Sequence, residues 1–274
     1  MRTLRGFSAS RPTLPGRPGY PYGYRKWLRQ SHGVHVNDRM KNHYEAVCQT
    51  IKNEIERSAF WTQILQGLRT LDDEYLVERH TTLVHSFTPP VVTKSFDSFL
   101  NKTFRKNILR NANYPDPPTG GWLLPPAWLS QVNDVVRTTL TVHFLDGVEY
   151  LLQYIREIAD GVGGSVQEEF EARVEGYYAV HLYFQTPIEI VQRNFSKETR
   201  TFSFEIQITT QVKELIKEIL HPFYERERLT GASRKDWRWD YNSDEFIANH
   251  LGHILHYVEG MIVQVRDRQR EAKL

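Results

Sequence analysis

The chain has 274 residues, of which 40% are hydrophobic and 12% aromatic, and its formal net charge at pH 7 is +2. This composition is typical of a globular fold with a sizeable core, and the small net charge does not by itself indicate a nucleic-acid or membrane partner. A single cysteine, Cys48, excludes a disulfide framework, and because no run of about 18 apolar residues occurs, we expect a cytoplasmic protein with no membrane span.

The first part of the chain divides into an arm and a helical region. Residues 1–35 are rich in proline, glycine and arginine, so we expect a basic, largely extended arm without a helix. In residues 36–88, apolar residues recur at helical spacing. A first helix should begin at Asn37 or Asp38 and run to about Leu68, and a second should follow it.

A new unit begins after Pro89 and Pro90 and is expected to extend over residues 89–225. Ser95 is placed to cap its first helix. The elements expected after this helix are a strand at 135–144, a helix at 148–159, strands at 165–174, 178–191 and 201–208, and a helix at 211–224. Pro187 can divide the middle one of the last three strands. The order predicts an α/β (α+β) fold with a mixed β-sheet of about five strands flanked by helices.

The last part of the chain is expected to be a loop and a helix. Residues 226–242 are basic and contain Trp237 and Trp239, which indicates a loop. Ser243 is a plausible cap for a helix over residues 243–274. Its apolar side has enough surface to dock on the core or on another subunit, so a homo-oligomer is one expectation.

Two of the expected strands carry a polar row on one face. Alternation in residues 201–208 directs Glu205 and Gln207 to the face opposite the apolar side chains. The same parity in the preceding strand places Tyr177 and His181 together. On spacing alone, a solvent-exposed strand face is the ordinary interpretation. The alternative is a catalytic cleft that lines a sheet.

Other residues favour phosphate chemistry. Ser95 stands at a helix start, where free N–H groups and the helix dipole attract anions, so Lys94 and Lys102 are suited to hold a polyphosphate. Asp134 at the entry to a core strand and Glu205 in a later strand supply two carboxylates. Such a pair suits Mg²⁺ bound to a nucleoside triphosphate, because Mg²⁺ prefers a few hard oxygen ligands together with substrate phosphates.

In this order the residues resemble the synthetase domain of RelA/SpoT-type alarmone synthetases, over roughly Val91 to Glu225. The matching segments are Lys94–Lys102, Asp134, Gly176–His181, Glu205–Thr210 and His221-x-x-Tyr224. The resemblance implies a nucleotidyltransferase-like synthetase fold and a small alarmone synthetase or a toxic relative of one. Such an enzyme transfers pyrophosphate from ATP to the 3′-hydroxyl of GDP or GTP, makes (p)ppGpp and releases AMP.

The resemblance also implies roles for individual residues. The residues that would bind ATP are Lys94, Ser98, Lys102 and Arg137. Asp134 and Glu205 would be the catalytic residues and would hold Mg²⁺, and Glu205 would also orient or deprotonate the attacking hydroxyl. Tyr177 would stack on the acceptor purine, and His181 and Gln207 would line the acceptor side.

The chain departs from the family pattern at several positions. Val92 stands where the family has the Arg two residues before the first Lys, and Thr209 replaces another Arg. A strand Arg of the family falls on Thr139, and Arg137, on the same strand face, is a plausible substitute. A Lys-rich stretch that helps bind the acceptor phosphates is replaced by Glu168–Glu175, whose acidic residues would repel a free triphosphate acceptor.

The acceptor is therefore open, and two alternatives stand beside GDP or GTP. The first is a toxic synthetase-like enzyme that pyrophosphorylates the tRNA 3′ end or an adenine nucleotide, with an antitoxin protein as a further partner. The basic residues suited to contact RNA are Arg226, Arg228, Arg234, Lys235 and Arg238. The second alternative is a degenerate, non-catalytic nucleotide-binding module.

Overall fold

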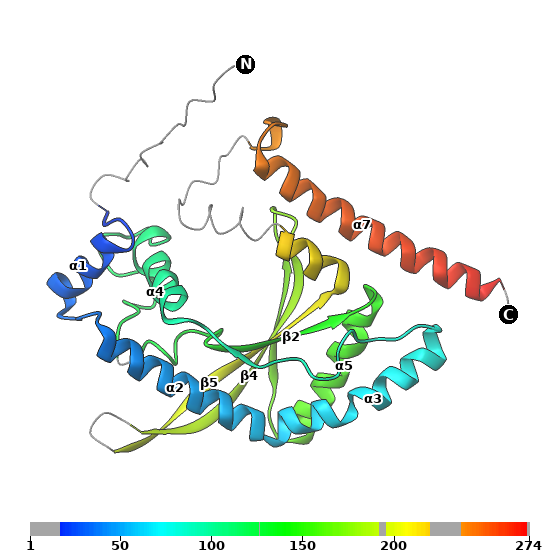
Figure 1. Ribbon diagram of the computed structural model, residues 1–274, viewed down its shortest axis with the longest axis horizontal. Coiled ribbons are helices and arrows are strands. Elements are labelled where there is room, and N and C mark those ends of the chain that lie inside the picture. Colours follow the sequence, from blue (N-terminus) through cyan, green and yellow to red (C-terminus); the bar gives the residue numbers. More distant parts are fainter. Residues whose placement is uncertain (1–16, 126, 192–195, 220–236, 273–274) are drawn as a thin grey trace.

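The computed structural model of the chain describes residues 17–125, 127–191, 196–219 and 237–272. Its centre is a mixed sheet of five strands in the order β1-β2-β5-β4-β3 (Figure 1). The strands are β1 Val92–Thr93, β2 Val136–Val142, β3 Val166–Ala172, β4 Tyr178–Val191 and β5 Lys197–Thr210. The pair β2 and β5 is parallel and the other pairs are antiparallel. This confirms the predicted mixed α/β fold.

Helices precede, interrupt and follow the strands. They are α1 Tyr22–His32, α2 Asp38–Arg57, α3 Ala59–Arg79, α4 Phe96–Phe104, a π-helical turn Arg105–Leu109, α5 Asp146–Gly161, a helix over residues 211–219, a 3₁₀ turn Trp237–Trp239 and α7 Asp244–Glu271. Asn37, Ser95 and Ser243 cap α2, α4 and α7 as expected, each accepting a hydrogen bond from a backbone N–H of the first turn.

Two predicted boundaries are wrong. The long helix expected to reach Leu68 ends at Arg57, because Ser58 adopts an extended conformation and its side chain caps α3 instead. Pro187 does not divide β4, which continues through it to Val191. Proline lacks the N–H that a central strand would donate, but β3 pairs with β4 only as far as Phe184, so Pro187 has no neighbour on that side.

The expectation of an extended arm over residues 1–35 is also wrong at Tyr22–His32, which form α1. Pro21 and Gly33 stand at the two ends of α1, where they start and stop a helix rather than break it. Tyr24 and Leu28 are fully buried on its inner side. The Tyr24 hydroxyl donates to the hydroxyl oxygen of Thr103 at 3.0 Å, which ties α1 to α4. Residues 1–16 lie outside the described residues.

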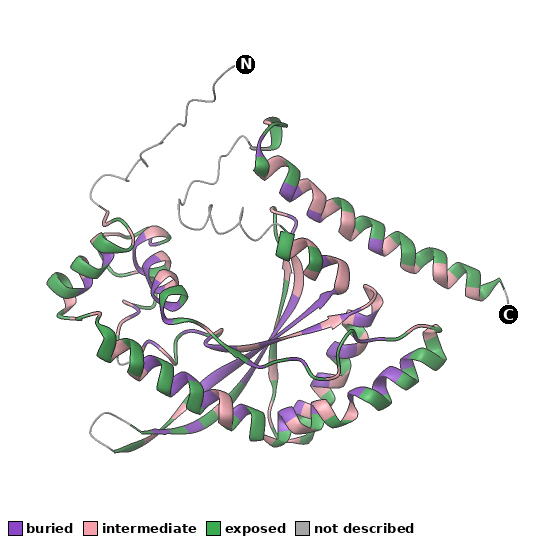
Figure 2. Cartoon of the chain, viewed as in Figure 1, coloured by how far each residue is buried: buried purple, intermediate pink, exposed green. Residues whose placement is uncertain are grey.

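The apolar face of the sheet packs against α2, α3 and α5. Figure 2 shows buried residues along the strands and on the inner sides of these helices. Phe60 stacks on Phe184 with ring centroids 3.8 Å apart, and Trp61 meets Phe204 edge-on at 5.4 Å. Burial of a large aromatic side chain contributes about 1.5–3 kcal/mol, so these rings anchor β4 and β5 under the helices. The opposite face of the sheet is thereby left for polar side chains.

Helix α7 docks beside the first residues of β4. Gly252 of α7 and Gly176 approach so closely that an added Cβ on Gly252 would lie 2.5 Å from the Gly176 carbonyl oxygen. His256 stacks on Tyr178 with centroids 3.7 Å apart, and Arg266 donates to Asp146 at 2.6 Å. Much of the apolar side of α7 is exposed, so the homo-oligomer stays a prediction. Within the described residues, no helix combines the length and apolar character needed to cross a membrane.

Candidate active site

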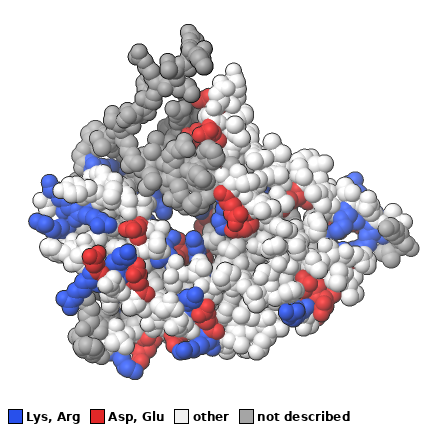
Figure 3. Space-filling view, in the orientation of Figure 1, with Lys and Arg blue, Asp and Glu red and all other residues white. Residues whose placement is uncertain are grey.

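The polar row of β5 is buried rather than exposed to solvent. The side of β5 away from the helices carries Ser203, Glu205, Gln207 and Thr209, which are only 7%, 4%, 8% and 7% exposed. In the sheet register Glu205 lies between Arg137 of β2 and Tyr183 of β4. A solvent-exposed strand face is therefore excluded, and β2, β4 and β5 together build the floor of a polar site. Figure 3 shows side chains of both charge signs around a hollow near the centre of the view.

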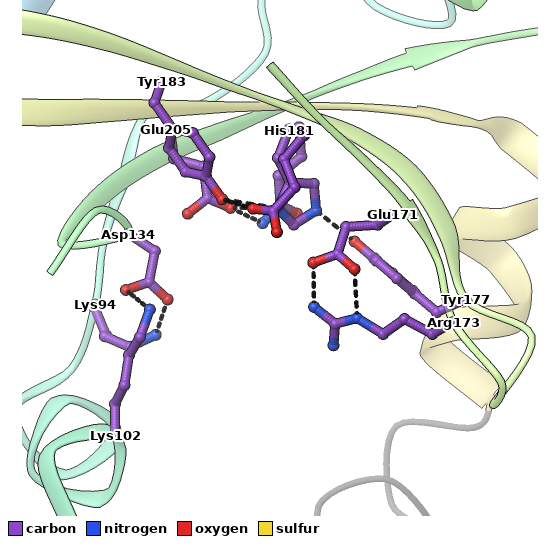
Figure 4. A network of polar contacts seen from close by, with 11 residues as sticks. Lys94, Lys102, Asp134, Glu171, Arg173, Tyr177, His181, Tyr183 and Glu205 are labelled. Carbon is purple, nitrogen blue, oxygen red and sulfur yellow. Dashed lines mark hydrogen bonds and ion pairs between the residues drawn. The ribbon is translucent and has the colours of Figure 1, made fainter. Parts of the chain in front are cut away.

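At one end of this site two lysines share a carboxylate (Figure 4). The ammonium groups of Lys94 and Lys102 donate to the two Asp134 oxygens at 2.8 and 2.7 Å. Burial by itself raises the pKa of Asp134, but the attraction of the two lysines outweighs burial and holds the pKa well below its ordinary value. Burial lowers the pKa of Lys94, and Asp134 opposes that shift. One carboxylate thus leaves one net positive charge on the cluster.

The other predicted ATP-binding residues lie around this cluster. Ser98 is exposed one helical turn before Lys102, and its backbone N–H is capped by Ser95. Arg137 is the direct cross-strand partner of Val92 in the antiparallel pair of β1 and β2. Side chains at paired positions lie on the same face of a sheet, so Arg137 brings a guanidinium beside the position where Val92 replaces an Arg of the family.

Glu205 is held through only one of its carboxylate oxygens. Gln207 donates to Oε1 at 2.5 Å, and Nδ1 of His181 lies 3.4 Å from the same oxygen. Oε2 has no hydrogen-bond partner among the described residues. It is not among the fully buried atoms that lack a partner, so it keeps some exposure to solvent. The second oxygen therefore faces the accessible side of the site, where it can receive a proton or a cation.

His181 links Glu205 to Tyr177. The Tyr177 hydroxyl lies 3.0 Å from Nε2 of His181, and burial raises the pKa of Tyr177 to about 12, so the hydroxyl keeps its proton. Burial lowers the pKa of His181, although Glu205 opposes the shift. A neutral imidazole that accepts from Tyr177 at Nε2 carries its proton on Nδ1, facing Glu205. The three predicted acceptor residues, Tyr177, His181 and Gln207, are thus brought together.

Thr209, at a position where the family has Arg, lines a small cavity of about 30 Å³ beside the acceptor residues. The other lining residues include Tyr177, Gln207, Lys213 and Lys217. Burial lowers the pKa of Lys213 to about 8, against the raising effect of Glu259. Two lysines of the helix over residues 211–219 therefore stand on the acceptor side, near the site of the missing Arg.

The acidic stretch in β3 is less repulsive than its sequence predicts. Arg156 of α5 holds Glu168 through two hydrogen bonds of 2.5 and 2.6 Å, and Arg173 holds Glu171 in the same way. Glu168 and Glu171 are thus each matched by a guanidinium, which offsets much of their negative charge. The sequence reasoning missed this because an Arg in α5 and the geometry of a turn decide the pairing.

Tyr183 is a further residue of this face that the sequence reasoning did not single out. Its hydroxyl donates to Glu169 at 3.0 Å and lies 3.5 Å from Nδ1 of His181. The signal was present, since Tyr183 continues the alternation that joins Tyr177 and His181. The predicted contacts of Arg226, Arg228, Arg234 and Lys235, and those of His221 and Tyr224, lie outside the described residues.

The donor set fits magnesium shared with a substrate better than a metal held by protein alone. In the described part of the chain, no group of three or more His, Cys, Asp or Glu side chains gathers as a metal site. Asp134 is kept ionised by its lysines, and Glu205 presents one open oxygen. Mg²⁺ bound with a nucleotide needs only one or two carboxylates, because phosphates and water complete its shell.

Comparisons with known proteins agree with this architecture. No protein-family model matches the chain, and no curated protein matches it. The small alarmone synthetase 1 of Bacillus subtilis bound to its product pppGpp is 16% identical, with a TM-score of 0.52 over 85% of this chain and 97% of that one. A GTP pyrophosphokinase family protein from Streptococcus pneumoniae is 16% identical, with a TM-score of 0.50 over 86% and 95% of the two chains. The chain has the fold of the GTP pyrophosphokinases and small alarmone synthetases.

Proposed function

We propose that the chain is an ATP-dependent pyrophosphokinase that transfers pyrophosphate from ATP to the 3′-hydroxyl of GDP or GTP, makes (p)ppGpp and releases AMP. One buried polar face supports this function, because it carries the Lys94 and Lys102 pair, the open oxygen of Glu205 and the Tyr177 ring in succession (Figure 4). A solved structure of the same fold is bound to its product pppGpp, which supports a guanine nucleotide as acceptor.

ATP would bind at the lysine end of the face. Its β- and γ-phosphates take the place of Asp134 as partners of Lys94 and Lys102, and Arg137 adds a third cation beside them. The freed Asp134 carboxylate would hold Mg²⁺, and the open oxygen of Glu205 is left for the acceptor hydroxyl. When bound, Mg²⁺ supplies positive charge that offsets the charge of the phosphates.

The acceptor ribose would lie between Glu205 and Tyr177. Its 3′ oxygen forms a bond to the β-phosphorus of ATP, and the bond from that phosphorus to the bridging oxygen of the α-phosphate breaks. AMP leaves with the electron pair, and Oε2 of Glu205 takes the proton of the hydroxyl. Gln207 and His181 hold the other oxygen, which fixes the carboxylate plane toward the acceptor.

The test is a transfer assay with ATP labelled in its γ-phosphate, Mg²⁺ and each of GDP, GTP, ATP and deacylated tRNA. Transfer of the label to GDP or GTP, with release of one AMP for each label transferred, is the expected result. Label on tRNA or on an adenine nucleotide would instead identify the toxic synthetase-like alternative. If no acceptor receives label, the result would favour the alternative of a non-catalytic binding module.

Glu205→Gln tests the proposed base. The amide keeps the size of the side chain but cannot take a proton, so the rate of AMP release should fall by about 100- to 10,000-fold. Glu189→Gln is the matched control, since Glu189 lies on β4 in an exposed pair with Lys197. Equal activity of Glu205→Gln and wild type would contradict the role of Glu205 as the base.

A further inference from the structure

Arg173 has no role in the reaction as proposed, although it lies beside the acceptor residue Tyr177. It belongs to the tight turn between β3 and β4, where its backbone N–H donates to the Tyr177 carbonyl at 3.0 Å. The Gly176 N–H donates to the Arg173 carbonyl at 2.9 Å, and Gly176 has a φ of +74°, which only glycine adopts freely. The turn therefore fixes Arg173 next to the Tyr177 ring.

The contacts of the Arg173 guanidinium leave one edge open. Nε and Nη2 donate to the two oxygens of Glu171 at 2.7 and 2.5 Å, which uses the side edge of the group. Its Cζ lies 5.2 Å from the centroid of the Tyr177 ring. Nη1 has no hydrogen-bond partner in the described part of the chain, and the side chain is 47% exposed. The end edge, formed by Nη1 and Nη2, is therefore available to a ligand.

A structural role does not explain this pair. Arg156 and Glu168 make the same two-bond contact, but they join α5 to β3 and so tie two elements together. Arg173 and Glu171 stand two residues apart at a turn, and the guanidinium's further contact is with the Tyr177 ring. Because the contact between Glu171 and Arg173 is local to the turn and the Arg173 side chain is 47% exposed, it does not join one element to another. Its effect is to hold a guanidinium in one orientation over an aromatic ring.

We propose that Arg173 reads the acceptor base as guanine, an inference that rests on the proposed function because Tyr177 is taken as the stacking platform. A purine stacked on Tyr177 occupies the same layer as the guanidinium. The end edge of Arg173 then donates to O6 and N7 of guanine, the usual contact of Arg with that base. Adenine presents an amino group in place of O6, which cannot accept from Arg173. Glu171 positions the guanidinium and keeps the pair neutral.

The test compares GDP, 7-deaza-GDP and ADP as acceptors for wild type, Arg173→Ala and the matched control Arg156→Ala. We expect Arg173→Ala to lower kcat/KM for GDP by about 5- to 150-fold through the acceptor KM, with the KM of ATP unchanged. Wild type and Arg156→Ala should prefer GDP to 7-deaza-GDP, which lacks N7. Arg173→Ala should use the two equally, because the group that senses N7 is gone.

Titration calorimetry with the same nucleotides separates this inference from the proposed function. If no acceptor receives label, the proposed function fails. Tighter binding of GDP than of 7-deaza-GDP by wild type and Arg156→Ala, but not by Arg173→Ala, would still support Arg173 as the reader of the base. Equal binding of the two nucleotides by wild type would overturn it. So would a preference for GDP that persists in Arg173→Ala, since the sensor of N7 would then be another residue.

Discussion

Replacing Asp134 with Asn removes the shared counter-ion of Lys94 and Lys102 while keeping the size of the side chain. The two lysine side chains are 11% and 24% exposed, so both are mostly buried. Removing one partner of a buried ion pair costs about 3–5 kcal/mol. The amide oxygen still accepts one hydrogen bond and Lys102 keeps some water, so we expect a loss of about 3 kcal/mol in the free energy of unfolding.

The same substitution should strengthen the response to a polyphosphate. In wild type, phosphates compete with Asp134 for Lys94 and Lys102. In Asp134→Asn that competition is gone, so ATP with a chelator should raise the Tm of the variant more than that of wild type. AMP release should nevertheless be lost, because the variant lacks the carboxylate proposed to hold Mg²⁺.

Urea denaturation, a thermal melt with chelated ATP and the transfer assay measure the three effects. Asp97→Asn is the control, because Asp97 is exposed in a loose pair with Arg25 at 3.6 Å and should change stability by less than about 0.5 kcal/mol. Unchanged stability of Asp134→Asn would refute the view that the lysines depend on Asp134. If ATP raises the Tm of Asp134→Asn no more than that of wild type, the phosphates do not bind at Lys94 and Lys102.

Two further predictions concern Gly252 of α7 and Lys213 of the helix over residues 211–219. Gly252→Ala should destabilise the chain by about 1–3 kcal/mol, because its Cβ would lie 2.5 Å from the Gly176 carbonyl oxygen. Gly260→Ala on the same helix meets nothing within 4 Å and should stabilise by up to about 1 kcal/mol, so equal effects in urea denaturation would contradict this packing. Burial lowers the pKa of Lys213 to about 8 from 10.5, so the unfolded chain holds the proton more tightly and stability should rise between those pH values. Lys213→Met should lose that rise when unfolding is measured at pH 8 and pH 10.

The sequence predicted those strands and helix ends that depend on a few neighbouring residues. The alternation in β2, β4 and β5 and the caps of α4 and α7 each depend on a few neighbouring residues, and each was confirmed. The same alternation placed Glu205 and Gln207 on one face correctly. The extended arm is wrong over Tyr22–His32 because a high content of proline and glycine does not by itself exclude a helix: Pro21 stands at the start of α1, and Gly33 follows its end.

The sequence by itself thus determined the strand faces through alternation and the helix caps through single residues, and the order of its motifs indicated the residues of the proposed site. Only the tertiary structure decided that the polar row of β5 is buried, that Arg137 stands beside Val92, and that Glu168 and Glu171 are paired with arginines. The reason is physical. Periodicity and capping act over a few residues, whereas burial and charge pairing depend on which strand or helix the register brings opposite.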